Sequence, residues 1–347
     1  MRKIFKKIVF SLLLLLLVFS NDKGNIGFID KLTSGYQFEI LLWEIKNLPK
    51  KYTSIFKKSD LSETVVRNVL ENDYANSDLI DIELFFEKEI SKKIKQKLDK
   101  NYIFPPLDFV IQDSPKVLVI SPRDSIVQQY VLLISSDIPL DKIIEIENAI
   151  DMRNFSSLIV NTGGFASYPS MVKKSKNYDY MISTISHEWL HQYLFFSPLG
   201  QAYFKGGEMI KLNETLADIF GQEIANLPEE KNIFYPDVIF NDFLKETRLE
   251  VDRLLKNKEI NTAETYMKNR TIKLQSLGYK TRKINQAYFA FHGNYGSSPS
   301  SLSEYDNKLN KLRNEYNSFS LFLDDLKKIK NIEEFNELIN LKTAESK

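Results

Sequence analysis

The chain has no cysteine and only three histidines among its 347 residues. Without cysteine there can be no disulfide, no thiol nucleophile, no thiolate metal site and no lipid attached through sulfur. Any metal ion must therefore be held by histidine and carboxylate side chains, and an exported form of the chain must be stabilised by its core.

The chain also lacks an excess of charge and several well-known motifs. Its 47 basic and 46 acidic residues give a net charge of +1. Because there is no excess of basic residues, we expect no nucleic-acid partner. There is no G-x-S-x-G nucleophile elbow, no phosphate-binding G-x-x-x-x-G-K-[ST] and no dinucleotide-binding glycine pattern. Hydrophobic residues make up 43% of the chain, enough for a packed core.

The one long apolar run of the sequence lies near the N-terminus. Four basic residues in the first seven precede an apolar stretch at 8–19 that only Ser11 interrupts. This stretch of about 12 residues is shorter than the roughly 20 that cross a bilayer as a helix. Residues 1–20 are typical of a signal peptide, with an uncleaved membrane anchor as the alternative. We therefore expect an exported, extracytoplasmic protein of the cell envelope or medium, with membrane association through the N-terminus left open.

The periodicity of apolar residues predicts an α+β fold. Residues 21–104 and 231–347 read as helical regions, the first with Asp60 and Glu63 as a helix cap. Between them, residues 105–230 are expected to form an α+β core with a small sheet packed on the helices of the site. Three segments rich in β-branched residues are expected to be its strands: 116–121, 126–135 and 155–161.

The stretch ISHEWLHQYL, residues 185–194, contains H-E-x-x-H. On a helix, His187 and His191 lie on one face about 6 Å apart, so both imidazoles can bind one ion. Glu188 lies one residue further round, where a general base for a metal-activated water is needed. We expect the opposite face to be the buried one, with the apolar residues Ile182, Ile185, Trp189, Tyr193 and Phe196.

Catalytic zinc usually takes three protein ligands, so a third ligand must follow. KLNETLADIF supplies it: Glu214 comes 23 residues after His191, with Asp218 four residues further on the same helix face. Glu214 is expected to bind the ion, and Asp218 to accept the second ring N–H of a ligating histidine. The sequence thus predicts one Zn²⁺ per chain.

H187-E188-x-x-H191 followed by N213-E214-x-x-x-D218 resembles the gluzincins, zinc metallopeptidases whose third ligand is glutamate. The resemblance covers roughly residues 157–226, and the rest of the chain is similar to membrane-associated bacterial proteins with a peptidase motif. It implies hydrolysis of peptide bonds in a peptide or protein substrate.

The resemblance also implies a substrate-binding edge strand upstream of the motif helix. Residues 163–169 occupy that place, with Gly163, Gly164, Phe165 and Ala166 as the residues expected to pair with a peptide. The glutamate that reads a free N-terminus in the aminopeptidase branch is missing, since no acid lies between Asn161 and Tyr178. This argues against aminopeptidase specificity.

Gluzincins further use a downstream tyrosine or histidine to stabilise the oxyanion, and here the resemblance points to His292 or Tyr295. Two other functions stay open. A catalytically inactive, zinc-stabilised binding protein of the cell envelope would keep the metal site, whereas a metal-free scaffold would leave the histidines and carboxylates of the two motifs unexplained. The sequence predicts no oligomeric state.

Overall fold

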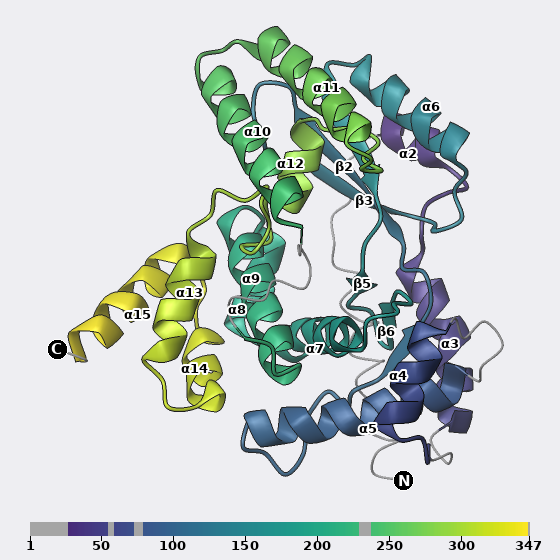
Figure 1. The fold of residues 1–347 in the computed structure, drawn as a ribbon, viewed down its shortest axis with the longest axis vertical. Coiled ribbons are helices and arrows are strands. Elements are labelled where there is room, and N and C mark those ends of the chain that lie inside the picture. Colours follow the sequence, from purple (N-terminus) through teal and green to yellow (C-terminus); the bar gives the residue numbers. More distant parts are fainter. Residues whose placement is uncertain (1–26, 55–58, 73–78, 229–236, 346–347) are drawn as a thin grey trace.

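Two small sheets, each surrounded by helices, make up the computed structural model of the chain (Figure 1). The structure describes residues 27–54, 59–72, 79–228 and 237–345. Helices predominate, and the predicted α+β class is confirmed. The expected leader at residues 1–20 lies outside the described part. Within that part, no helix has the length and apolar character to cross a membrane.

The first sheet consists of the three predicted strands. Its central strand β2 (Lys116–Pro122) pairs antiparallel with both β3 (Tyr130–Ile134) and β4 (Phe155–Val160). Side chains alternate between the two faces of a strand. In β2, Val117 and Val119 accordingly join one hydrophobic cluster, while Leu118 and Ile120 join another.

Helices cover both faces of this sheet (Figure 1). The cluster of Val117 and Val119 includes residues of α10, α11 and α12, and the cluster of Leu118 and Ile120 includes residues of α2 and α6. Fourteen α-helices lie in the described residues: α2 (Gly27–Thr33), α3 (Ile40–Ser54), α4 (Glu63–Glu71), α5 (Leu79–Lys97), α6 (Leu140–Asp151), α7 (Tyr178–Leu194), α8 (Pro198–Ala202), α9 (Glu208–Ile224), α10 (Val238–Lys256), α11 (Ile260–Ser276), α12 (Gln286–His292), α13 (Tyr305–Asn314), α14 (Phe319–Leu326) and α15 (Ile332–Glu345).

The sheet that contacts the motif helix is a second, separate one. The resemblance implied an edge strand at residues 163–169, of which only Gly164–Phe165 form a strand, and the sequence did not predict the two strands beside it. It has the order β1-β6-β5, with β1 (Phe109–Ile111) parallel to β6 (Ser170–Val172) and β5 (Gly164–Phe165) antiparallel to β6. Strands β5 and β6 pack on α7, whereas β2 and β4 contact α6 and α12. The expectation of one sheet packed on the site's helices is corrected accordingly. These strands are only two or three residues long, too short to show a period of two.

Helix α7 is buried on nearly all sides, which corrects the expectation of a single buried face. Its residues from Met181 to Leu190 are all buried, His187 and Glu188 included. The sheet of β5 and β6 covers one side, and helices α5 and α9 pack against others. Phe196, expected on the buried face, lies beyond the helix end and is exposed.

The helix cap expected at Asp60 is also corrected. Ser62 is the N-cap of α4, and its side chain accepts a hydrogen bond from the backbone N–H of Val65. Glu63 pairs with Arg67 one turn later on the same helix. Ser62, and not Asp60, is the N-cap because it directly precedes the first helical residue, Glu63.

The predicted regions share hydrophobic cores. One cluster combines Phe86 of α5, Trp189 of α7, Phe220 of α9 and Phe322 of α14, and so draws on all three regions. The boundary between residues 230 and 231 lies outside the described residues, and both boundaries stay predictions. The shared cluster means that α7 and α9 are supported from both ends of the chain.

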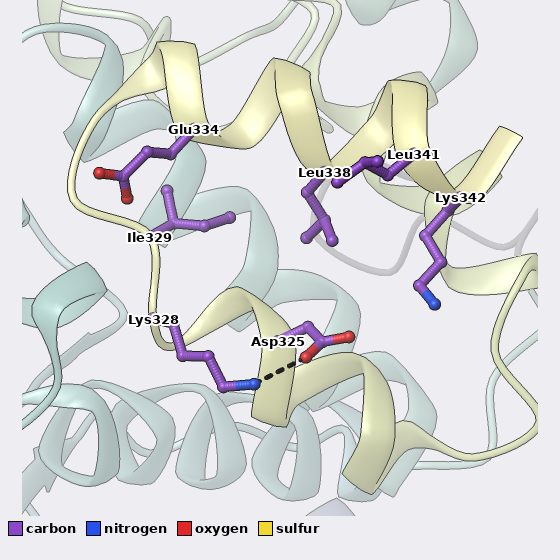
Figure 2. A pocket seen from close by; sticks show the side chains of 7 residues that line it. All are labelled: Asp325, Lys328, Ile329, Glu334, Leu338, Leu341 and Lys342. Carbon is purple, nitrogen blue, oxygen red and sulfur yellow. Dashed lines mark hydrogen bonds and ion pairs between the residues drawn. The ribbon is translucent and has the colours of Figure 1, made fainter. Parts of the chain in front are cut away.

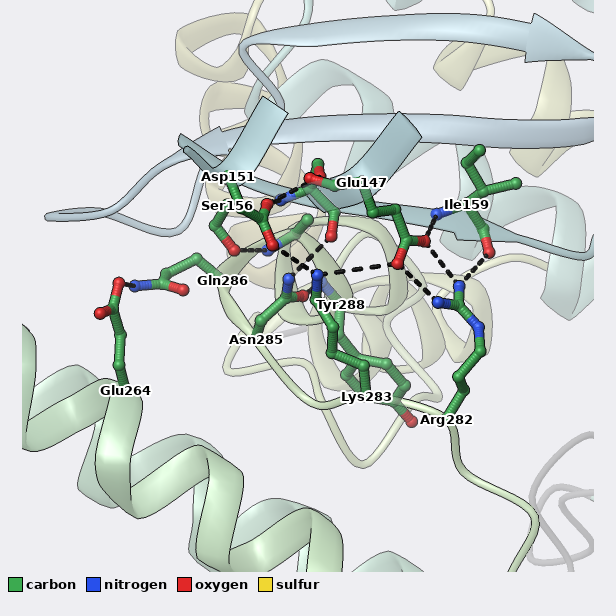
Figure 3. Close-up of polar contacts among 12 residues, drawn as sticks. Glu147, Asp151, Ser156, Ile159, Glu264, Arg282, Lys283, Asn285, Gln286 and Tyr288 are labelled. Carbon is green, nitrogen blue, oxygen red and sulfur yellow. Dashed lines mark hydrogen bonds and ion pairs between the residues drawn. The ribbon is translucent and has the colours of Figure 1, made fainter. Parts of the chain in front are cut away.

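A partly buried polar network fastens α12 to the first sheet (Figure 3). Arg282 donates to both carboxylate oxygens of Glu147, at 2.5 and 2.6 Å, and to the carbonyl oxygen of Ile159. The side chain of Asn285 caps α12 and donates to the carbonyl oxygen of Ser157. Because α12 ends at His292, this network sets where the following loop begins.

A buried carboxylate on α3 makes stability depend on pH. Glu44 is 2% exposed and accepts a hydrogen bond from the backbone N–H of Tyr168, at 2.9 Å, in the turn between β5 and β6. Burial raises its pKa to about 7, against the smaller lowering by that hydrogen bond. The folded protein therefore keeps a proton that the unfolded chain releases above about pH 4.5, so stability falls as the pH rises to about 7.

We expect Glu44→Gln to remove this dependence. The variant should match the wild type near pH 4 and exceed its free energy of unfolding at pH 8 by up to about 3 kcal/mol. Urea unfolding of both proteins between pH 4 and 8 measures the difference. Two curves that run parallel over the whole range would contradict the assignment.

Candidate metal centre

Three side chains able to bind a metal ion meet between α7 and α9. His187 and His191 lie one turn apart on α7, and Glu214 lies on α9. The two helices are held together by apolar contacts, such as the stacked rings of Trp189 and Phe220, whose centroids are 5.8 Å apart. This buried group could hold a metal ion.

The geometry of the three ligand atoms fits a small cation. The histidine Nε2 atoms are 3.1 Å apart, and Oε2 of Glu214 is 3.3 Å from that of His187 and 3.4 Å from that of His191. Ligands of a tetrahedral ion with bonds near 2.0–2.1 Å are about 3.3–3.4 Å apart. Two nitrogens and a carboxylate oxygen thus converge at the spacing that one ion requires.

Asp218 fixes the orientation of His187. Its Oδ1 lies 3.0 Å from Nδ1 of His187, so the ring can donate Nδ1–H there and keep the lone pair of Nε2 toward the other ligands. The other carboxylate oxygen of Asp218 accepts a hydrogen bond from the hydroxyl of Ser297, at 3.0 Å. The role of Asp218 toward a metal-binding histidine stays a prediction, and Ser297 is a partner that the sequence did not suggest.

Burial and charge act in opposite directions at this cluster. Burial alone would lower the pKa of His187, but hydrogen bonds to Asp218 and Glu214 and the charge of Glu188 raise it well above its ordinary value. Burial would raise the pKa of Glu214, yet His191 and His187 hold it far below its usual range. The carboxylates therefore make this buried site favourable for positive charge.

Glu188 lies between the metal group and the second sheet. It is 7% exposed, and burial raises the pKa of its carboxyl despite the opposing charges of His187 and His191. A Cβ on Gly164 would lie 2.3 Å from Oε1 of Glu188, so β5 can approach this carboxylate only with glycine there. A carboxylate with a raised pKa beside a metal group is suited to accept a proton from water.

The four residues expected to bind a peptide lie in and beside β5. Strand β5 is at the edge of its sheet and contacts α7. Gly163, Gly164, Phe165 and Ala166 are all half-buried. Gln192 of α7 donates to the carbonyl oxygen of Ser167 and so holds the turn after β5 against the motif helix. Their pairing with a peptide stays a prediction.

Tyr203 is a site residue that the sequence reasoning missed. It lies in a short 3₁₀ helix, η1 (Tyr203–Lys205), and its hydroxyl donates to Oε1 of Glu214 at 2.9 Å. Its ring stands edge-on to that of His191, at 5.8 Å. Burial, followed by the charge of Glu214, raises the pKa of Tyr203, which keeps the phenol protonated. The only sequence signal was a tyrosine between the two motifs.

The structure distinguishes the two oxyanion candidates. The ring of Tyr295 lies 6.5 Å from that of His187, and burial together with the nearby carboxylates raises its pKa, so it remains a neutral donor. His292 instead contacts the rings of Tyr288 and Phe291. Burial lowers the pKa of His292 to about 4. The geometry places Tyr295 nearer to the metal group.

Ser297→Ala offers a test of the hydrogen bond to Asp218. Loss of this bond leaves Asp218 less firmly held against His187, so we expect zinc to bind about three- to tenfold more weakly, below the 10–100-fold typical of a direct partner of a ligand. Competition with a chelating dye measures the affinity. Ser297→Thr should restore it.

Ser301→Ala is the matched control for this prediction. The hydroxyl of Ser301 donates to the carbonyl oxygen of Gly293 in the same loop and does not involve Asp218. We expect its zinc affinity to equal that of the wild type. Equal losses in the Ser297 and Ser301 variants would mean that loop conformation, and not the bond to Asp218, matters.

A surface pocket lies elsewhere, between α14 and α15 (Figure 2). It has a volume of about 310 Å³ and is lined by Asp325, Lys328, Ile329, Glu334, Leu338, Leu341 and Lys342. Lys328 and Asp325 form an ion pair on its wall. None of these residues belongs to the metal group, so the pocket does not mark the candidate reaction centre.

Within the described residues, the two histidines of H-E-x-x-H and the downstream glutamate form the one cluster of metal-ligating type. Tyr203, Tyr295 and Ser297 complete its surroundings. Comparison with protein families, curated proteins and solved structures found no match for the chain.

Proposed function

We propose that the chain is a zinc-dependent peptidase. The observation that carries the proposal is that Nε2 of His187, Nε2 of His191 and Oε2 of Glu214 lie within 3.1–3.4 Å of one another. The Glu188 carboxylate lies beside them. Two imidazoles and a carboxylate suit zinc, which accepts nitrogen and oxygen ligands in tetrahedral geometry. When bound, zinc would supply Lewis acidity, polarising a carbonyl oxygen and acidifying water.

The residues around the group have separate tasks in this proposal. Glu188 takes the proton of the attacking water and passes it to the leaving amine, for which a raised pKa is an advantage. Tyr295 donates to the developing oxyanion, with His292 as the alternative donor, a role typically worth about 3 kcal/mol of barrier. Asp218 keeps His187 oriented, and Tyr203 holds one oxygen of Glu214.

The substrate in this proposal is a peptide or protein segment that pairs with the edge of β5. An extended chain added to β5 would pass Gly164 and so run directly beside Glu188. The gluzincin resemblance and the leader at residues 1–20 further suggest a peptidase that acts outside the cytoplasm. These assignments rest on the two motifs together with the position of β5.

Mass spectrometry of a complex peptide mixture tests the proposal. The mixture is incubated with the zinc-loaded protein and, separately, with its Glu188→Gln variant. New peptide termini made only by the wild type are the expected result, and their positions would show endo- or exopeptidase action. No new termini with the wild type, in the presence of stoichiometric zinc, would overturn the proposal.

A second candidate is a binding protein in which zinc is only structural. It is favoured by burial, since His187, Glu188 and Glu214 are each only 7% exposed. Structural zinc sites are usually closed, whereas catalytic sites keep a position for water. Stoichiometric zinc without turnover, together with a large loss of stability on chelation, would favour this candidate.

A further inference from the structure

An exposed aromatic surface adjoins the metal group. It consists of Phe195, Phe196 and Phe204, which we call the aromatic platform. Phe196 is 46% and Phe204 59% exposed, and no other phenylalanine in the described residues is exposed. The rings are in contact, with centroids 5.1 Å apart for Phe195 and Phe196 and 6.2 Å for Phe195 and Phe204. Adjacent exposed aromatic side chains commonly mark a binding surface.

The platform extends the metal-binding face of α7. His187, His191 and Phe195 are spaced by four residues, and Phe195 continues the helical backbone as the C-cap, donating its N–H to the carbonyl oxygen of His191. Residues at this spacing share one helix face. A second line of ring contacts leads from His191 through Tyr203 to Phe204, at 5.8 and 5.7 Å. The platform is therefore one helical turn from a metal ligand.

Tight contacts hold the platform in place. A Cβ on Gly200 would lie 2.0 Å from the carbonyl oxygen of Leu194, so α8 packs directly against the end of α7. The side chain of Gln201 donates to the carbonyl oxygen of Phe195, and that of Asn213 to the carbonyl oxygen of Leu199. A preorganised surface loses little entropy when it binds.

We infer that the aromatic platform binds a bulky apolar side chain of the peptide substrate. Two aspects of the surroundings select this occupant. The platform is continuous with the face of α7 that carries the metal ligands, so a peptide at β5 and Glu188 can reach it. Lys205, which follows Phe204 in the chain, already donates to the carbonyl oxygen of Lys330. Aromatic and large aliphatic side chains gain most from contact with such rings.

The inference rests on the proposed function, and binding rather than turnover tests it. The probes are blocked Gly-Ser hexapeptides in which one phenylalanine occupies each of the six positions in turn, with alanine counterparts. Binding to zinc-loaded Glu188→Gln protein is measured by calorimetry. We expect at least one phenylalanine peptide to bind about tenfold or more tightly than its alanine counterpart, as burial of one such side chain predicts.

Substituting the platform residues then shows whether the preference for phenylalanine arises from the platform. Phe196→Ser with Phe204→Ser, in the same background, should abolish the preference for phenylalanine and leave the affinity of the alanine peptides unchanged. Met152→Ser is the matched control, because Met152 is 82% exposed at the end of α6. It should retain the full preference.

The outcomes separate this inference from the proposed function. A preference for phenylalanine that depends on the platform supports the inference. If the wild type cleaves none of the peptides, that result counts only against peptidase activity and leaves the inference in place. A preference that survives in the double variant, or no preference at all, overturns the inference. If the double variant instead loses self-association in sedimentation, the platform binds a second copy of the chain. If it loses binding to phosphatidylglycerol vesicles, the platform binds a lipid surface. Either result also overturns the inference.

Discussion

Replacing Glu188 with glutamine is expected to lower turnover by about 10²- to 10⁴-fold, the usual contribution of a general base, while zinc stays bound. Glutamine has the shape of glutamate and can occupy the same space against Gly164, but its amide cannot take a proton from water. None of the three metal-ligating side chains is altered. Initial rates on a cleaved peptide and zinc content by mass spectrometry measure the two effects.

Glu145→Gln is the matched control for this change. Glu145 lies on α6, away from the metal group, and pairs with Lys142 at the surface. Its variant should be as active as the wild type. A Glu188→Gln protein that retained full activity would show that another group accepts the proton.

Replacing His191 with alanine is expected to remove both zinc and activity. Two of three protein ligands remain, so the affinity for zinc should fall by more than the 10–100-fold typical when an outer partner is lost. An ion present at 100 times its dissociation constant stabilises a folded protein by about 2.7 kcal/mol. The variant should lose this gain, seen as a melting temperature that no longer responds to zinc.

His292→Ala is the control for the loss of a half-buried histidine. His292 contacts Tyr288 and Phe291 and not the metal group in the contacts described above. Its variant should keep stoichiometric zinc after dialysis and a zinc-dependent melting temperature. Stoichiometric zinc in the His191 variant would mean that the ion is held elsewhere.

The two experiments together separate the candidate functions. A peptidase requires that the Glu188 variant loses turnover and the His191 variant loses the ion as well. A zinc-stabilised binding protein requires only the second result. The separation is possible because His187, His191 and Glu214 form the group that could hold an ion, whereas Glu188 does not belong to that group.

The strands show which features of the fold could be predicted. The segments that became β2, β3 and β4 have five to seven residues with many β-branched side chains, and their composition was sufficient. Strands β1, β5 and β6 have only three, two and three residues; β5 and β6 pack on α7, and β1 contacts α5. The burial of nearly all sides of α7 could not be predicted either, because its histidine and hydroxyl side chains gave it a polar pattern on one face.

The sequence by itself determined how the residues pair within each half of the candidate metal group. His187 and His191 share a face because they are four residues apart on one helix, and Glu214 and Asp218 share a face of the next helix for the same reason. Only the tertiary structure brought the two halves together, by packing α7 against α9, and decided what surrounds them. Gly164 reaches the site from a short strand, Tyr203 from a 3₁₀ helix and Ser297 from a loop. Helical spacing is a local property of the chain, whereas contacts between distant segments exist only once the cores have formed.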